Sequence, residues 1–181
     1  MRACPGGSRQ GGPGGDHSQE ALPVILVDAG PLVALFDAND HQHDRCRRIL
    51  HELDDELLTT TPVLGEAFHL LRPGSPGPPK LMDFIRHGGL GVCPLDDQGL
   101  GRCFELMMRY ADLPMDFADA SIVTAAEQTR SDKVFTLDRS DFTTYRIRRG
   151  YHRVPFTIIG DTGGPRVVRE CMSVEESAAA P

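Results

Sequence analysis

Short apolar runs alternate with helical patterns along the middle of the chain. The four apolar residues 24–27 predict a buried strand, and Pro31 suits the first turn of a helix that follows it. Residues 43–53 carry apolar side chains at helical spacing on one face, which predicts a second helix. Residues 57–58 are a short strand candidate.

The same alternation continues to residue 159. The further predicted elements are a helix at 61–71 capped by Thr61, a Pro/Gly loop at 73–79, a helix at 80–87, a strand at 91–95, a helix from the Asp96 cap to 110, a helix at 116–128, and strands at 133–137 and 155–159. Strands separated by helices of this length indicate βαβ units. We therefore predict an α/β fold with three layers, α/β/α, around a mainly parallel central sheet.

The two ends of the chain differ from this middle part in composition. Residues 1–22 are rich in Gly, Ser, Gln and Pro, which predicts a disordered arm, and residues 161–181 predict a flexible tail. The folded domain is expected at 23–160. An apolar fraction of 40% is enough to supply a core for one domain of this size.

Charge and cysteine usage narrow the class of protein. A formal net charge of −7 argues against holding nucleic acid by bulk positive charge, but an acidic catalytic site would itself lower the net charge. The 5 cysteines include no C-x-x-C pair, which indicates free thiols in a reducing compartment. The Gly-rich start lacks the apolar centre of a signal peptide, and no apolar stretch approaches the roughly 20 residues of a membrane span. We expect a soluble, cytoplasmic protein without a membrane partner.

Two predicted strands end on an acid. Asp28 follows the strand at 24–27, and Asp138 follows the strand at 133–137. Ligands in open α/β sheets bind beyond the carboxyl ends of the strands, so both carboxylates belong to the functional edge. Acids also follow strands because they suit turns and helix caps, which is the structural alternative for each. Thr136 lies two residues before Asp138 and could orient a metal-bound water.

Two further acids lie on predicted helices. Asp119 precedes Ile122, Val123 and Ala126 at helical spacing, so it belongs to the face that packs on the core. A buried carboxylate is costly unless it finds a cation or several donors. Asp116 lies one turn earlier, where either a ligand role or an N-cap role fits.

Glu66 is the only acid in the helix predicted at 61–71, which is apolar nearly all round and is therefore predicted to be buried. The alternative is that Glu66 lies on one exposed stripe of this helix.

Carboxylates gathered at one sheet edge repel each other, and a divalent cation removes that penalty. Oxygen ligands without a Cys or His set favour Mg²⁺, with Mn²⁺ as a substitute, and such a site suits phosphodiester hydrolysis. The predicted catalytic residues are Asp28, Glu66, Asp119 and Asp138, and Asp116 joins these four as a predicted metal ligand.

Basic residues follow the last of these acids. Arginines can bind phosphates, and the nearby Tyr145 and Tyr151 can stack on bases, although a solvated charged face is an equal alternative. The candidate RNA-binding residues are Arg139, Arg146, Arg148 and Arg149. A second candidate patch consists of Arg45, Arg47 and Arg48. His41 fits a polar turn better than a substrate contact.

Several segments together resemble a known family. They are residues 24–28 with 31–36, the turn at 37–43, Thr61-Pro-Val-Leu-Gly-Glu-Ala67, Met115-Asp-Phe-Ala-Asp-Ala-Ser121 and Thr136-Leu-Asp-Arg-Ser-Asp-Phe142. In order and spacing they are similar to the PIN-domain ribonucleases, and among these to the VapC-type toxins of type II toxin–antitoxin systems. The resemblance covers about residues 23–160.

This resemblance implies a metal-dependent endoribonuclease, a hydrolase of RNA phosphodiester bonds. It implies Asp28, Glu66, Asp119 and Asp138 as the metal-binding acids, with Asp116 as a frequent companion. It also implies a homodimer and a cognate antitoxin that blocks the site. Many relatives carry Ser or Thr just after the first acid, where this chain has Ala29 and Gly30, so a supporting hydroxyl is expected to be missing.

Other functions remain open on the sequence. A catalytically weak PIN-like module would bind RNA or a protein partner without cleavage. A phosphatase with Asp28 as nucleophile is disfavoured because the position two residues later, where such enzymes carry another Asp, is Gly30. The histidines show no partner geometry for a metal-free ribonuclease.

Overall fold

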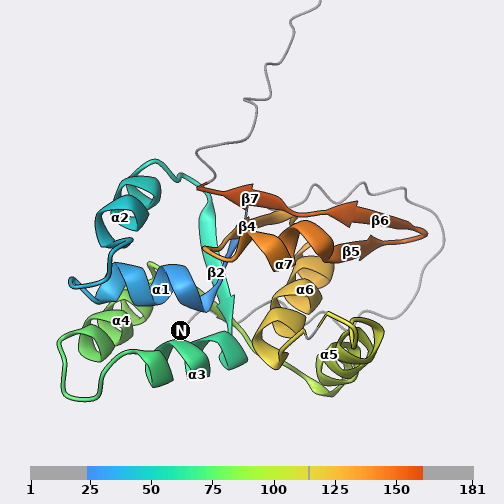
Figure 1. Ribbon diagram of the computed structural model, residues 1–181, viewed down its shortest axis with the longest axis horizontal. Coiled ribbons are helices and arrows are strands. Elements are labelled where there is room, and N and C mark those ends of the chain that lie inside the picture. The colour runs from blue at the N-terminus through green and yellow to red at the C-terminus, as the bar shows by residue number, and fades with distance from the viewer. Residues whose placement is uncertain (1–23, 114, 161–181) are drawn as a thin grey trace, which may run out of the picture.

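The fold is an α/β domain with a five-stranded sheet, as seen in a computed structural model that describes residues 24–113 and 115–160 (Figure 1). The arm predicted at 1–22 and the tail predicted at 161–181 lie outside these residues. The strands are β1 (Val24–Val27), β2 (Glu56–Thr60), β3 (Gly91–Cys93), β4 (Lys133–Phe135), β5 (Arg146–Arg149), β6 (His152–Pro155) and β7 (Thr157–Ile159). The helices are α1 (Ala29–Phe36), α2 (His43–His51), α3 (Thr61–Leu70), α4 (Gly77–Arg86), α5 (Asp97–Arg109), α6 (Phe117–Thr129) and α7 (Arg139–Thr144).

The central sheet has the strand order β3-β2-β1-β4-β7, and all its neighbouring pairs are parallel. Ile25 on β1 pairs with Leu57 on one side and with Lys133 on the other. The chain first builds outward from β1 to β2 and β3, and then returns to place β4 against the other side of β1. This reversal leaves a switch point at the carboxyl ends of β1 and β4, where ligands bind in open parallel sheets.

Helices cover both faces of the sheet. Figure 1 shows α1, α2 and α4 on one side and α5 and α6 on the other. All four residues of β1 are buried, as a strand covered on both faces requires. Helix α6 is buried continuously from Ala120 to Ala126 and packs against β1, β2 and α5. The predicted three-layer α/β/α fold with a parallel sheet is confirmed. No helix in the described ranges has both the length and the apolar character that crossing a bilayer requires.

Most predicted boundaries differ from the observed ones by a few residues, and one difference has a clear cause. Helix α4 begins at Gly77, inside the predicted loop at 73–79. Its first turn contains Pro78 and Pro79, which is tolerated because N–H groups there have no partner within the helix. Thr60, rather than Thr61, caps α3, since its hydroxyl accepts a hydrogen bond from the Val63 amide at 3.5 Å.

The segment 139–155 holds elements that the hydrophobic pattern did not predict. Helix α7 is short, and β5 and β6 form a separate antiparallel hairpin with arginines along β5. Gly150 has a φ of +60° at the first position of the two-residue loop, where a type II′ turn requires a positive φ. The polar strands carry no period-two apolar signal strong enough to be recognised in the sequence.

A buried ion pair joins the hairpin to the main body. The guanidinium of Arg102 on α5 donates to both carboxylate oxygens of Glu127 on α6, at 2.9 and 2.8 Å. Glu127 also accepts a hydrogen bond from the backbone N–H of Arg148 on β5, at 3.0 Å. The side chains of Arg102 and Glu127 are each only 9% exposed. Glu127 therefore connects α5, α6 and the hairpin through one carboxylate.

Candidate functional site

Asp28 lies at the end of β1 and is the N-cap of α1. Its Oδ1 accepts a hydrogen bond from the Ala29 amide at 2.7 Å, and its Oδ2 accepts one from the Thr136 hydroxyl at 2.8 Å. The residue is 9% exposed. Burial raises the pKa of this carboxyl, and the hydrogen bonds from Thr136 and Ala29 oppose that rise. The capping interpretation of Asp28 is thus confirmed, and its role as a metal ligand stays a prediction.

Thr136 connects the ends of β1 and β4. While its hydroxyl donates to Asp28, the hydroxyl oxygen accepts a hydrogen bond from the Asp138 amide at 3.0 Å. The hydroxyl is therefore engaged by protein groups. The Thr136 hydroxyl also supports Asp28. The sequence analysis had predicted that Asp28 lacks a supporting hydroxyl, because Ala29 and Gly30 follow it where many relatives carry Ser or Thr. Thr136, which directly follows the neighbouring strand β4, takes this place.

Asp138 is exposed and caps α7. Its Oδ1 accepts hydrogen bonds from the amide and the hydroxyl of Ser140, at 3.1 and 2.8 Å. The Ser140 hydroxyl also lies 3.1 Å from a carboxylate oxygen of Asp141, which belongs to the first turn of the same helix. Asp141 was not among the predicted site residues. The sequence could have indicated Asp141, because it follows Asp138 by three residues within the segment 136–142 that resembles the family.

Asp119 is half-buried on α6 and has a tyrosine partner. The phenol of Tyr145 donates a hydrogen bond to Asp119 Oδ2 at 3.0 Å. Burial and, next, the negative charges of Asp116 and Asp28 raise the pKa of Asp119 to about 7, and the bond from Tyr145 partly offsets this. Tyr145 itself is 2% exposed. The interpretation of Tyr145 as a stacking platform for RNA bases is therefore wrong, because its ring is inside the core.

Asp116 is exposed and is the N-cap of α6, accepting a hydrogen bond from the Asp119 amide at 2.8 Å.

Glu66 on α3 is half-buried, and desolvation followed by the charges of Asp116 and Asp28 raises its pKa. The prediction that α3 is buried on nearly all sides is wrong. Its buried residues are Val63 and Ala67, because the helix lies at the rim of the site with one face open.

One pocket of about 500 Å³ gathers the acids at the switch point. The acidic residues that line it are Asp28, Glu66, Asp116, Asp119, Asp138 and Asp141. All five predicted metal ligands therefore reach the same pocket, from β1, α3, α6 and the end of β4. Ala29, Gly30, Leu70 and Leu137 complete the lining. We refer to this pocket as the acidic pocket.

The chemistry of the acidic pocket fits a hard divalent cation. Its charged donors are all carboxylates. Those of Asp28, Glu66 and Asp119 have raised pKa values, first because burial desolvates them and then because other negative charges lie nearby. As the side chains stand, no three His, Cys, Asp or Glu residues within 24–113 and 115–160 form a group that could hold a metal ion. Binding an ion would require some of the carboxylates that line the pocket to turn toward Asp28 and Asp119, which hydrogen bonds hold in place.

The raised pKa values predict how the metal-free protein responds to pH. In EDTA, we expect the free energy of unfolding to decrease as the pH rises from about 4 to about 8. An acid whose pKa is higher in the folded protein than in the unfolded chain stabilises the fold while it is protonated. For Asp119 this stabilisation is complete below its unfolded pKa of 3.8, and it is lost as the pH rises through its folded pKa of about 7. Urea midpoints measured across this range test it. Asp119→Asn should flatten the decrease, and an unchanged pH dependence in this variant would contradict the argument.

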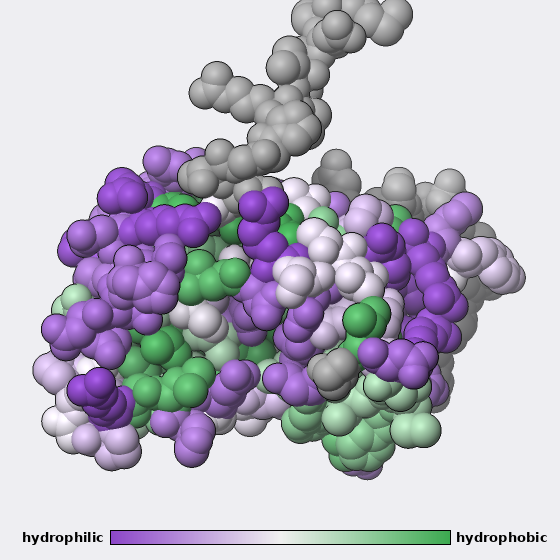
Figure 2. Space-filling model, viewed as in Figure 1, coloured by the Kyte–Doolittle hydropathy of each residue, from purple (hydrophilic) through white to green (hydrophobic). Residues whose placement is uncertain are grey.

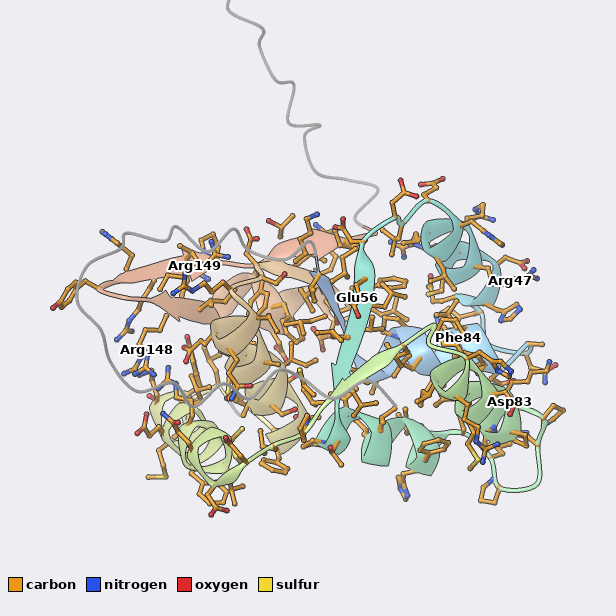
Figure 3. All side chains as sticks on the ribbon, turned by 180° about the vertical axis from the view of Figure 1, so that it is seen from behind. Arg47, Glu56, Asp83, Phe84, Arg148 and Arg149 are labelled. Atoms are coloured by element: carbon orange, nitrogen blue, oxygen red, sulfur yellow. The ribbon has the colours of Figure 1, made fainter. Side chains whose placement is uncertain are left out.

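Arg146, Arg148 and Arg149, which are candidate RNA-binding residues, form bonds within the protein. Arg146 donates to the carbonyls of residues 143–145 at 2.7–2.9 Å and so caps α7. Arg148 lies 3.7 Å from Glu127, and Arg149 donates to the Arg130 carbonyl at 2.8 Å. Arg139 is exposed at the start of α7, next to Asp138. Figure 3 shows Arg148 and Arg149 on the hairpin, at the opposite side of the molecule from Arg47 on α2.

Comparison with known proteins gives consistent results. The family model of the PIN domain matches residues 25–147. A curated relative, Ribonuclease VapC26 of Mycobacterium tuberculosis, is 23% identical over 124 residues, which is 67% of this chain and 92% of the relative. The crystal structure of VapC20, a Sarcin-Ricin loop cleaving toxin of the same species, has a TM-score of 0.58 and 22% identity, and covers 64% of this chain and 91% of that one. A toxin–antitoxin complex from Klebsiella pneumoniae has a TM-score of 0.50 and 16% identity over 66% of this chain and 91% of that one.

Proposed function

The chain belongs to the PIN domain family, and from this premise we propose that it is a metal-dependent endoribonuclease, the toxin of a toxin–antitoxin pair. The observation that carries the proposal is the acidic pocket, where carboxylates from four separate elements meet at the switch point of a parallel sheet. The names of the relatives, a ribonuclease and an RNA-cleaving toxin, support RNA as the substrate.

We assign the metal to Asp28, Glu66, Asp116, Asp119 and Asp138, with Mg²⁺ or Mn²⁺ as the ion that this oxygen donor set favours. When bound, such an ion lowers the pKa of water and stabilises negative charge on phosphoryl oxygens. Thr136 and the Ala29 amide each hold one oxygen of Asp28, so this carboxylate has a fixed orientation. Tyr145 does the same for Asp119 Oδ2. These partners limit how far either acid can turn.

The proposed partners are an RNA substrate, a cognate antitoxin and a second copy of the chain, in the cytoplasm. The toxin–antitoxin complex that shares the fold supports the choice of an antitoxin. An exposed apolar cluster supports a homodimer, and Figure 2 shows apolar surface over this part of the molecule. The residues of this apolar cluster are Phe104 and Met108 on α5, Leu113 in the segment after α5, and Phe117 at the start of α6. Exposed apolar patches of this kind mark protein contacts.

The purified full chain is expected to cleave RNA in the presence of Mg²⁺ or Mn²⁺ and to lose this activity in EDTA. Activity should return when excess Mn²⁺ is added back, because the chelator removes the ion without unfolding the protein. Gel analysis of a structured RNA, together with circular dichroism of the EDTA-treated protein, makes the measurement. RNA binding without cleavage under all metal conditions would instead support the alternative of a catalytically weak binding module.

A further inference from the structure

A second pocket adjoins the acidic pocket. It has a volume of about 290 Å³ and shares Gly30, Leu70 and Leu137 with the acidic pocket as lining residues. Because both pockets are lined by these three residues, they lie next to each other. The other residues of the second pocket are Val33, Asp40, His41, Gln42 and Arg45. We call it the α1–α2 pocket, since these residues belong to α1, the turn after it and α2.

The α1–α2 pocket combines an apolar floor with a polar rim. Val33, Leu70 and Leu137 form the apolar part, whereas the rim is a turn held in place by its own hydrogen bonds. Asp40 Oδ1 accepts from the Gln42 amide at 2.7 Å, and the His43 ring lies 2.7 Å from the Ala34 carbonyl. Pockets for small ligands usually combine apolar side chains with a few polar groups in fixed positions. The volume of the α1–α2 pocket is at the lower end of the range for such pockets, which begins at about 300 Å³.

Arg45 brings a positive charge to this rim, which also carries the carboxylate of Asp40. Its guanidinium donates to Gln42 Oε1 at 3.2 Å and to the Gly160 carbonyl at 2.6 Å. Its Nε is buried and has no hydrogen-bond partner among the described residues. Within those residues no carboxylate lies within 4.0 Å of it, whereas Arg102, Arg148 and Arg149 all have acidic partners. A guanidinium has five N–H donors, and the bonds to Gln42 and Gly160 use only two of them, so the Nη1 and Nη2 groups of Arg45 still have donors for an incoming anion.

We propose that the α1–α2 pocket is a subsite for the RNA nucleotide adjacent to the bond that is cut. The base lies on the floor of Val33, Leu70 and Leu137 beside His41, and Arg45 binds a phosphate of the same strand. This proposal rests on the proposed ribonuclease function. Single-stranded RNA is recognised through unstacked bases and phosphate contacts, and both fit a small pocket with one arginine. The subsite also explains how an anionic strand stays next to six carboxylates that repel it.

Two variants test the subsite from different directions. Arg45→Gln removes the charge, and Val33→Phe fills the floor without changing the bonds of Arg45. Arg86→Gln is the matched control, because Arg86 is exposed on α4 and pairs with Asp83 on the same helix. The probe is a short fluorescent oligoribonucleotide of mixed sequence with 2′-O-methyl groups, which exclude attack by a 2′-hydroxyl. Binding is followed by anisotropy in EDTA, which removes the metal that hydrolysis by water requires, at several salt concentrations.

Arg45→Gln is expected to weaken binding about tenfold and to reduce the slope of log affinity against log salt by about 1, while Arg86→Gln changes neither. Val33→Phe should weaken binding without changing the salt slope. With cleavable RNA, Arg45→Gln should raise KM more than it lowers kcat. A merely structural role of Arg45 would not change the salt slope, and an unchanged melting temperature excludes unfolding as the cause.

The outcomes separate this proposal from the proposed function. Binding by both variants that matches the Arg86→Gln control overturns the subsite, whether or not the wild-type chain cuts RNA. Wild-type binding that depends on Arg45 and Val33, but without cleavage in any metal, supports the subsite and overturns the ribonuclease assignment. A wild-type chain that neither binds nor cuts RNA overturns both.

Discussion

Replacing Asp119 by asparagine is expected to reduce RNA cleavage about a thousandfold while leaving the fold intact. The substitution keeps the shape of the side chain and an oxygen that can accept from Tyr145, but it removes one carboxylate charge from the acidic pocket. The contribution of a catalytic metal is several kcal/mol, and each 1.36 kcal/mol is about a factor of ten in rate. Initial rates with Mn²⁺ measure the loss.

The control for Asp119→Asn is Asp112→Asn, which makes the same change at an exposed position. Asp112→Asn should cut at the wild-type rate. The melting temperature of Asp119→Asn in EDTA should be equal to or above that of the wild type, because the repulsion from Asp116 and Asp28 is removed. Wild-type cleavage by Asp119→Asn would contradict the site, and a lower melting temperature would show that lost folding explains lost activity.

Arg102→Ala is expected to lower the free energy of unfolding by about 3 kcal/mol, the lower end of the range for removing one partner of a buried pair. The lower end applies because Glu127 keeps the Arg148 amide as a partner at 3.0 Å. For a domain of this size, the loss corresponds to a decrease in melting temperature of about 6–12 °C. Urea unfolding followed by circular dichroism measures it.

A double variant and a surface control make the Arg102 result interpretable. Arg102→Met combined with Glu127→Leu should recover most of the lost stability, because no uncompensated charge then stays buried. Arg86→Ala, which removes an exposed partner of Asp83, should change the unfolding free energy by less than about 1 kcal/mol. Equal losses for Arg102→Ala and Arg86→Ala would show that burial does not determine the strength of the Arg102 pair.

The sequence alone predicted the layers of the fold and five of the six acids that line the acidic pocket, all but Asp141. The apolar run at 24–27 and the helical spacing around Asp119 are local patterns, and each depends on residues within a few positions of one another. A parallel sheet then places every strand end at one edge, so Asp28 and Asp138 could be assigned to the same site without a structure. Glu66 and Asp119 were assigned on a different ground, because an acid on a buried helix face is costly without a cation, and the family resemblance added Asp116 to the set.

Only the tertiary structure decided which groups support those acids. Thr136 reaches Asp28 across 108 positions of the chain, and the Tyr145 phenol reaches Asp119 from 26 residues away. It also showed Arg148 bonded to Glu127 and Arg45 at the rim of a second pocket. Hydrogen bonds and ion pairs depend on distances of about 3 Å. Such distances between remote residues are set by how elements pack, which no local periodicity encodes.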